Sequence, residues 1–276
     1  MTQAAATFVE AKGFAIPLVG LGTWALRGRD CARLVEQAIR LGYRHIDTAQ
    51  MYDNEREVGE GVRNSGKRAE VIVTTKVQPT LLAPPDLERS VKESLARLRL
   101  DHVDLLLIHW PNPRVPLVET LGAMAKMKRQ GYTRAIGVSN FTVTLLDEAN
   151  KVSPEPLVCN QIECHPFLDQ HKVIEACRRH EMAVIAYSPI ARGSAKGDAV
   201  LERIAKAHGK TAAQVCLRYL VQQGIAVIPR TSKLQRLEEN FSLFDFALTD
   251  QEMDEIRALS KRNDRLVDWT WSPKWD

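Results

Sequence analysis

Short apolar runs recur along the chain at intervals of mostly about 25–30 residues, and turn residues bound each run. Several of the runs are continuously apolar, which is typical of parallel strands that are covered on both faces. Eight strands are therefore predicted. They cover residues 18–23, 44–48, 71–77, 103–110, 135–141, 158–163, 183–189 and 226–230.

Amphipathic patterns of helical spacing fill the intervals between these runs. A glycine ends the first pattern at Gly42, prolines open the second, and Thr211 is a predicted N-cap. The predicted helices cover 32–42, 84–100, 198–208 and 211–224, with a final helix that opens at Thr249.

Strands that alternate with helices in this order predict a (β/α)8 TIM barrel. The chain has 276 residues, and no linker rich in proline, glycine or serine divides it. We therefore expect a single domain over 1–276, with extra helices and an irregular C-terminal tail from about residue 260.

Composition narrows the function classes. The formal net charge is only +4, which gives no argument for a nucleic-acid partner. No apolar stretch approaches the ~18 residues of a membrane span, and the N-terminus lacks the pattern of a secretion signal. Five scattered cysteines without a CxxC pair indicate reduced thiols, so we expect a cytoplasmic protein without a structural metal.

Polar side chains end the predicted strands. Asp47 and Tyr52 follow the second strand, Lys76 closes the third and His109 closes the fourth. The carboxyl ends of barrel strands converge on one face, so these four side chains can meet there. Such residues carry chemistry in many barrels, although any one of them alone is more often a satisfied polar group at a strand end.

Three segments resemble the aldo-keto reductases. They are GYRHIDTAQMYDNEREVG (42–59), RAIGVSNF (134–141) and PRTSKLQRLEEN (229–240), in that order along the chain. The segment AQMYDNE and the ending NDRLV…PKWD resemble the bacterial members that reduce 2,5-diketogluconate and methylglyoxal. The resemblance implies a reductase of aldehydes and ketones.

In that reading Tyr52 donates a proton to the carbonyl oxygen. A free tyrosine has a pKa of about 10, so it is a poor donor at neutral pH. We expect the ammonium of Lys76 to lower this pKa, and Asp47 to keep Lys76 charged and oriented. His109 is expected to hydrogen-bond the carbonyl oxygen of the substrate.

The hydride must come from a cofactor, since no side chain can supply one. The resemblance implies NADPH, with NADH as a weaker alternative. Ser139, Asn140 and Gln161 would hold the carboxamide, and Tyr187 would stack on the nicotinamide. Further expected cofactor contacts are Thr23, Trp24, Asp47, Ser188, Arg230, Thr231, Lys233, Arg236, Glu239 and Asn240. The cluster at 230–240 favours a 2′-phosphate because a guanidinium binds phosphate in bidentate geometry. Many relatives have Lys-Ser where this chain has Arg230-Thr231, so the margin of NADPH over NADH is open.

A competing motif lies near the N-terminus. Residues 20–25, GLGTWA, fit the G-x-G-x-x-A dinucleotide fingerprint after a strand. The fingerprint needs its third small residue inside the opening helix, whereas this helix is predicted to begin only near Asp30. We expect Gly20 and Gly22 to allow close chain approach at the barrel mouth instead.

The expected substrate is a small carbonyl compound, and the protein is expected to be a monomer. Trp24, Trp110, Trp269 and Trp271 would wall an apolar pocket, although the two tail tryptophans could equally pack the C-terminus onto the barrel. A nicotinamide-binding sensor on the same barrel is one alternative. A metal-assisted hydrolase that uses Asp47 and His109 is another, but it lacks further ligands; the orientation of His45 is open and His165 could reach the mouth.

Overall fold

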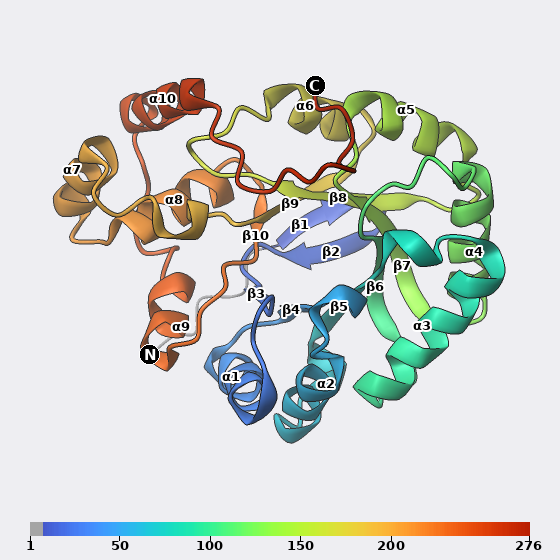
Figure 1. Cartoon of the computed structure of the whole chain (residues 1–276). Helices are drawn as coiled ribbons and strands as arrows, with labels where there is room; N and C mark the ends of the chain where they lie inside the picture. The colour runs from blue at the N-terminus through green and yellow to red at the C-terminus, as the bar shows by residue number, and fades with distance from the viewer. Residues whose placement is uncertain (1–7) are drawn as a thin grey trace.

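The computed structural model describes residues 8–276, and the predicted barrel is confirmed (Figure 1). Eight parallel strands form one sheet in the order β10-β9-β8-β7-β6-β5-β4-β3. They are β3 (Leu21–Gly22), β4 (His45–Asp47), β5 (Ile72–Val77), β6 (Val103–Ile108), β7 (Thr133–Ser139), β8 (Leu157–Glu163), β9 (Ala183–Tyr187) and β10 (Ala226–Val227). Residues 1–7, on which the prediction about the N-terminus partly rests, lie outside the described residues.

The barrel closes where its first and last strands meet. Val19 pairs in parallel with Val227, and the amide of Gly20 donates to the carbonyl of Val227 at 2.8 Å. A Cβ on Gly22 would lie 2.6 Å from the carbonyl oxygen of Ile228, so the chains can approach this closely only at a glycine. The predicted role of these glycines in close approach is confirmed.

Helices surround the strands (Figure 1). They are α1 (Gly28–Leu41), α2 (Glu55–Asn64), α3 (Pro84–Leu98), α4 (Leu117–Arg129), α5 (Val143–Val152), α6 (His171–Arg179), α7 (Ala199–His208), α8 (Ala212–Val221), α9 (Leu234–Phe241) and α10 (Asp250–Ala258). Short 3-10 segments are Gln50–Tyr52, Arg68–Glu70, Pro79–Leu81, Ala191–Gly193 and Leu259–Arg262. The extra helix predicted near 198–208 is α7, and the Thr211 and Thr249 caps both form capping boxes.

Burial follows from the apolar runs. All six residues of β6 and all seven of β8 are buried, because the barrel interior covers one face and the helices cover the other. The apolar stripe of α1 contributes Leu34, Val35 and Ile39 to this core.

An N-terminal hairpin was not predicted. It joins β1 (Phe8–Ala11) to β2 (Phe14–Pro17) through Lys12 and Gly13, whose φ angles of 50° and 78° are those of a tight primed turn. Residues 9–12 share a surface hollow with 181–183, where β9 begins, so the hairpin covers the end of the barrel opposite the strand carboxyl ends.

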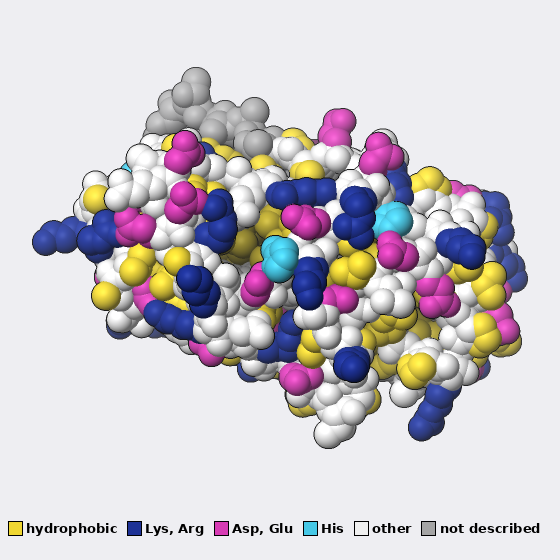
Figure 2. Space-filling model, turned by 90° about the horizontal axis from the view of Figure 1, so that it is seen from above, with side chains coloured by type: hydrophobic (Ala, Val, Ile, Leu, Met, Phe, Trp, Pro, Cys, Tyr) yellow, Lys and Arg dark blue, Asp and Glu magenta, His cyan; other side chains and the backbone are white. Residues whose placement is uncertain are grey.

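The C-terminal tail runs over the other end. After α10 the chain crosses the mouth of the barrel towards α5, where the carboxylate of Asp276 accepts the amide hydrogen of Val143 at 2.9 Å (Figure 1). On the face shown in Figure 2, basic and acidic side chains are interspersed, with no large region of one sign.

We predict opposite outcomes for alanine at two helical glycines. A Cβ at Gly59 of α2 would lie 1.9 Å from the carbonyl oxygen of Leu98, whereas a Cβ at Gly122 of α4 meets nothing within 4 Å. Gly59→Ala should lower the free energy of unfolding by about 2–3 kcal/mol or more through overpacking. Gly122→Ala should raise it by about 0.5–1 kcal/mol through helix propensity. Urea denaturation of both variants checks this, and equal effects would contradict the packing described.

Candidate active site

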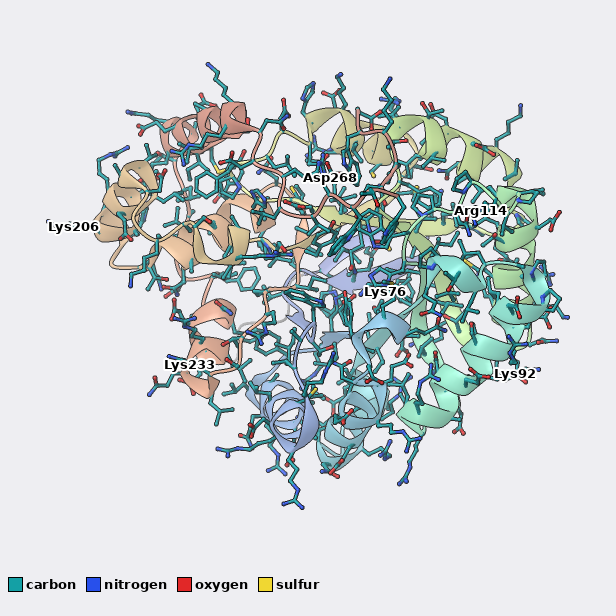
Figure 3. The ribbon with its side chains drawn as sticks, viewed as in Figure 1. Lys76, Lys92, Arg114, Lys206, Lys233 and Asp268 are labelled. Carbon is teal, nitrogen blue, oxygen red and sulfur yellow. The ribbon has the colours of Figure 1, made fainter. Side chains whose placement is uncertain are left out.

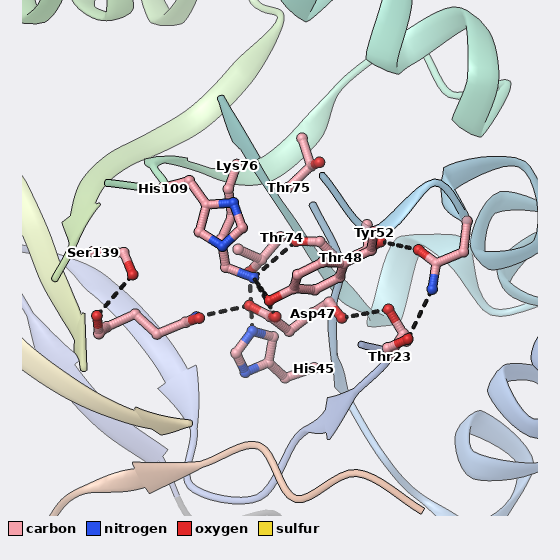
Figure 4. A network of polar contacts seen from close by, with 12 residues as sticks. Thr23, His45, Asp47, Thr48, Tyr52, Thr74, Thr75, Lys76, His109 and Ser139 are labelled. Carbon is pink, nitrogen blue, oxygen red and sulfur yellow. Dashed lines mark hydrogen bonds and ion pairs between the residues drawn. The ribbon is translucent and has the colours of Figure 1, made fainter. Parts of the chain in front are cut away.

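A buried ion pair lies inside the barrel at the carboxyl ends of the strands. The Nζ of Lys76 lies 2.5 Å from Oδ1 of Asp47, and both side chains are at most 1% exposed. The same ammonium donates to the carbonyl of Thr48 at 2.9 Å and to the hydroxyl of Tyr52 at 3.2 Å (Figure 4). Its three hydrogens therefore have three acceptors, which is the condition for keeping a buried lysine charged. Figure 3 shows Lys76 at the centre of the barrel, whereas Lys92, Lys206 and Lys233 lie on its periphery.

Tyr52 is placed by the loop that follows β4. Asn54 donates to the carbonyl of Thr23 at 2.8 Å and accepts from the hydroxyl of Thr48 at 2.7 Å. Gln50 accepts the amide hydrogen of Gln78 at 3.0 Å on the other side. These bonds hold the loop that carries Tyr52 between the segment after β3 and the segment after β5. Sequence reasoning missed Gln50 and Asn54 as positioning residues, although both lie in the segment 42–59 on which the resemblance rests.

His109 and Asn140 complete the floor of the site. The imidazole of His109 lies edge-on to the Tyr52 ring with 5.5 Å between the ring centroids. The Asn140 amide donates to the His109 carbonyl at 3.0 Å and accepts from the hydroxyl of Tyr187 at 2.8 Å. Asn140 has a φ of 63°, a left-handed conformation that asparagine tolerates better than most residues. The strand ends therefore brace one another.

Gln161 links this floor to the ion pair. Its Nε2 donates to Oδ2 of Asp47 at 2.7 Å. The Ser139 hydroxyl donates to the backbone carbonyl of Gln161 at 2.8 Å. Thr23 donates to the Asp47 carbonyl at 2.9 Å. The four expected catalytic residues thus come together with five of the expected cofactor contacts, namely Thr23, Ser139, Asn140, Gln161 and Tyr187.

These side chains form the floor of a cleft of about 440 Å³. Of the expected residues, the structure places most in its lining, namely Thr23, Trp24, Asp47, Tyr52, His109, Trp110, Ser139, Asn140, Gln161, Tyr187, Ser188, Arg230, Arg236 and Trp269. Lys76 lies behind Tyr52 and Asp47. The other expected residues, Thr231, Lys233, Glu239, Asn240 and Trp271, are outside the lining.

Comparison with known proteins identifies the family and supports the fold. Residues 18–261 match the model of the Aldo/keto reductase family. The chain belongs to this family. It is 42% identical over 267 residues to the methylglyoxal reductase DkgB of Escherichia coli O157:H7, covering 95% of this chain and all of that protein.

Two solved structures extend the comparison. A crystal structure described as a 2,5-diketo-D-gluconic acid reductase B matches with a TM-score of 0.95 at 45% identity, over 98% of each chain. An aldo-keto reductase of Bombyx mori in complex with NADP matches with a TM-score of 0.89 at 34% identity, over 96% of each chain. The prediction of an NADP-dependent oxidoreductase of this family, similar to the bacterial reductases of methylglyoxal and 2,5-diketogluconate, is confirmed.

At this candidate site the pKa of Tyr52 differs from expectation. Burial raises the pKa of Tyr52, and the opposing effect of Lys76 does not outweigh it. The predicted net lowering of this pKa is therefore wrong, because the sequence did not reveal how deeply the phenol lies. Burial disfavours the charge of Lys76, but Asp47 and Tyr52 more than compensate and raise its pKa. The phenol thus keeps its proton beside a permanent cation.

His109 is neutral. Burial, assisted by the charge of Lys76, holds its pKa well below the ordinary value. Its Nδ1 is buried without a partner among the described residues. A neutral imidazole can donate one hydrogen bond into the cleft without adding charge.

The structure shows where the two histidines whose positions were left open lie. His45 faces the barrel interior below Asp47, where its Nε2 lies 2.9 Å from the Thr74 hydroxyl. His165 is bound to Glu163 instead of lining the cleft. Among residues 8–276 no group of three or more His, Cys, Asp or Glu side chains is arranged to hold a metal ion. In the same range no helix is long and apolar enough to cross a membrane.

Several lining residues were not predicted. Met51, Ile190, Arg192 and Val267 all contribute to the cleft. Arg192 lies over the Trp24 ring at 5.1 Å, so the segment after β9 reaches across to the loop after β3. The long interval after the seventh predicted strand was a signal for this segment, but the sequence does not show where such a loop folds.

A pH dependence follows from His45. Burial lowers its pKa to about 4, whereas an unfolded histidine titrates near 6.5. As pH falls from 7 to 5 the unfolded chain takes up a proton that the folded chain refuses, so stability falls by about 2 kcal/mol from this group. Urea unfolding at both pH values should show a loss smaller by about this amount in His45→Gln. His102→Gln, where the side chain is partly exposed, should keep the full loss, and an unchanged loss in His45→Gln would contradict the assignment.

Proposed function

We propose that this reductase converts small aldehydes and ketones to alcohols with NADPH, and that Tyr52 is the proton donor. Methylglyoxal, aromatic aldehydes and 2,5-diketogluconate are the proposed substrates. One observation carries the proposal: the Tyr52 hydroxyl faces the cleft while hydrogen-bonded at 3.2 Å to an ammonium that Asp47 holds in place.

The residues present fit a nicotinamide cofactor. The floor offers amide and hydroxyl groups from Ser139, Asn140 and Gln161 together with the Tyr187 ring, and Arg230 and Arg236 line the same cleft. We propose that the first set holds the carboxamide and that the arginines, with Thr231 and Lys233, bind a 2′-phosphate. Glu239 and Asn240 would lie at the edge of the adenine, and Glu239 accepts from the Thr211 hydroxyl at 2.7 Å. When bound, the nicotinamide supplies the hydride.

The proton step follows from the charges. As the carbonyl oxygen gains negative charge it becomes a stronger base than the buried phenolate, so the Tyr52 proton moves to it. The phenolate that remains is stabilised by Lys76 at hydrogen-bond distance. His109, being neutral, donates to the same oxygen and orients the substrate. The tryptophans Trp24, Trp110 and Trp269 provide apolar walls for it.

The proposal also covers the domain organisation, oligomeric state and location of the protein. We propose that residues 1–276 make one domain, that the tail from about residue 260 completes the substrate pocket, and that the protein is a cytoplasmic monomer without a nucleic-acid or membrane partner. NADH would serve as a weaker cofactor. If the protein oxidises NADPH but not NADH in the presence of a carbonyl compound, it is fully selective for NADPH.

Tyr52→Phe tests the proton donor. It should lower kcat by about 10²–10⁴-fold, because the ring remains while the acid is lost. The affinity for NADPH should stay within about threefold. Loss of NADPH absorbance with methylglyoxal and with an aromatic aldehyde measures turnover. Tyr132→Phe removes a hydroxyl outside the cleft and should behave as wild type. Turnover of Tyr52→Phe within tenfold of wild type would overturn the assignment, and tight NADPH binding without turnover by the wild type would favour the sensor.

Arg230→Ala tests the cofactor preference. Loss of a charge-assisted contact to phosphate is worth roughly 1.5–3 kcal/mol, so Kd for NADPH should rise at least about tenfold. Kd for NADH, which has no 2′-phosphate, should change little. Fluorescence titration with both nucleotides measures this, and Arg203→Ala, an exposed arginine of α7, is the matched control. Equal weakening of both nucleotides would mean that Arg230 does not contact the 2′-phosphate.

A further inference from the structure

A second buried carboxylate lies at the mouth of the barrel, and the proton-transfer network does not use it. Glu163 is the last residue of β8 and is 1% exposed. Its Oε1 accepts the backbone amide hydrogen of Leu266 at 2.6 Å, and its Oε2 accepts that of Val267 at 2.9 Å. One side chain of the barrel therefore holds two consecutive amides of the C-terminal tail.

The surrounding bonds require Glu163 to act as an acceptor. The amide of Phe167 donates to Nδ1 of His165 at 3.3 Å, which leaves the imidazole hydrogen on Nε2, 2.9 Å from Oε1 of Glu163. The carboxylate thus receives three donors, which suits its ionised form. The Phe167 carbonyl accepts the amide hydrogen of Asp264 at 2.8 Å and fastens the tail a second time.

The tail adds a cation and an aromatic cluster. The guanidinium of Arg265 lies over the Trp275 ring at 3.9 Å, and the indole of Trp275 donates to Asp268 at 2.9 Å. Trp110, two residues after β6, packs edge-on against Trp271 with 5.1 Å between the ring centroids. The tail is consequently a folded strap at the mouth, and Figure 3 shows Asp268 in the upper part of the view, on the side of the barrel where α6 lies.

The position of this strap determines one wall of the cleft. Val267, whose amide Glu163 holds, lines the cleft, and so does Trp269 two residues later. Side chains two apart on a strand point to the same face. Glu163 therefore lies on the same face of β8 as Gln161, whose Nε2 contacts Asp47 at 2.7 Å. A single strand end thus contacts both the proton-transfer network and the substrate wall.

We propose that Glu163 is a positioning residue for the carbonyl substrate. By accepting the amide hydrogens of Leu266 and Val267 it fixes Val267 and Trp269 as a wall of the cleft and so determines which substrates bind well. This inference rests on the proposed reductase function. Glu163 does not touch the reacting atoms, and its effect is carried by the tail.

Glu163→Gln is the first test, because the isosteric amide turns an NH₂ group towards donors that need an acceptor. The KM for an aromatic aldehyde should rise about tenfold, and that for methylglyoxal should rise less because a small substrate contacts the wall less. The kcat and the Kd for NADPH should stay within about threefold. Amide hydrogen exchange of residues 264–270 should become faster.

A double-mutant cycle tests whether the effect passes through the tail. Trp269→Ala alone should also raise the KM for the aromatic aldehyde, and adding Glu163→Gln to it should cause little further change. Additive effects on KM, or unchanged exchange of the tail in Glu163→Gln, would overturn the proposal. Glu55→Gln is the matched control, since Glu55 is a buried carboxylate that holds Thr75 and Arg97 away from the tail. It should alter stability without changing the ratio of the two KM values.

The outcomes separate this inference from the proposed function. If the wild type reduces none of the carbonyls, the proposed function fails, whereas hydrogen exchange still decides whether Glu163 holds the tail. If Glu163→Gln does not fold, Glu163→Asp keeps the charge but withdraws it from the tail by one methylene. The same rise in KM and the same faster exchange are expected for it, and their absence would overturn the proposal.

Discussion

The buried ion pair between Asp47 and Lys76 is the interaction on which the site depends. Two charges removed from water are costly unless every donor and acceptor is satisfied. Here the ammonium has three acceptors, one of them the Tyr52 hydroxyl, and Asp47 has a second donor in Gln161. Tyr52 therefore satisfies one hydrogen of the buried ammonium, and the same bond that stabilises the ion pair places the phenol against the cation.

Closure of the barrel makes this arrangement possible. Asp47, Lys76 and Gln161 come from β4, β5 and β8, which are brought to a common mouth only when the sheet curves round on itself. The glycine at Gly22 lets the last strand approach the first without a side chain between them. The result is a rigid floor made of strand ends, whereas the walls come from the loops after β3 and β9 and from the tail.

This division explains what the sequence could predict. The eight apolar runs and the polar residues at their ends depend on local pattern, so the barrel and the convergence of Asp47, Tyr52, Lys76 and His109 were predictable. The hairpin at 8–17 was missed because its strands have only four residues each and its turn signal is a single glycine. The net direction of the Tyr52 pKa was missed because burial depth is a property of the assembled site and is not written in any local motif.

The strand end of β8 shows why loops resist prediction from the sequence while the floor does not. Gln161 and Glu163 lie two apart on one strand, yet Gln161 contacts a side chain at another strand end, whereas Glu163 holds backbone amides of the tail. A carboxylate that accepts backbone hydrogens does not constrain the identity of the side chains in the segment it holds. The same carboxylate can therefore hold tail segments with different side chains. In this chain the segment that it holds contributes Val267 and Trp269 to the wall of the cleft. In this arrangement the hydrogen-bonded network around Lys76 is fixed by side-chain identity, whereas one wall of the cleft is fixed by the segment that Glu163 holds.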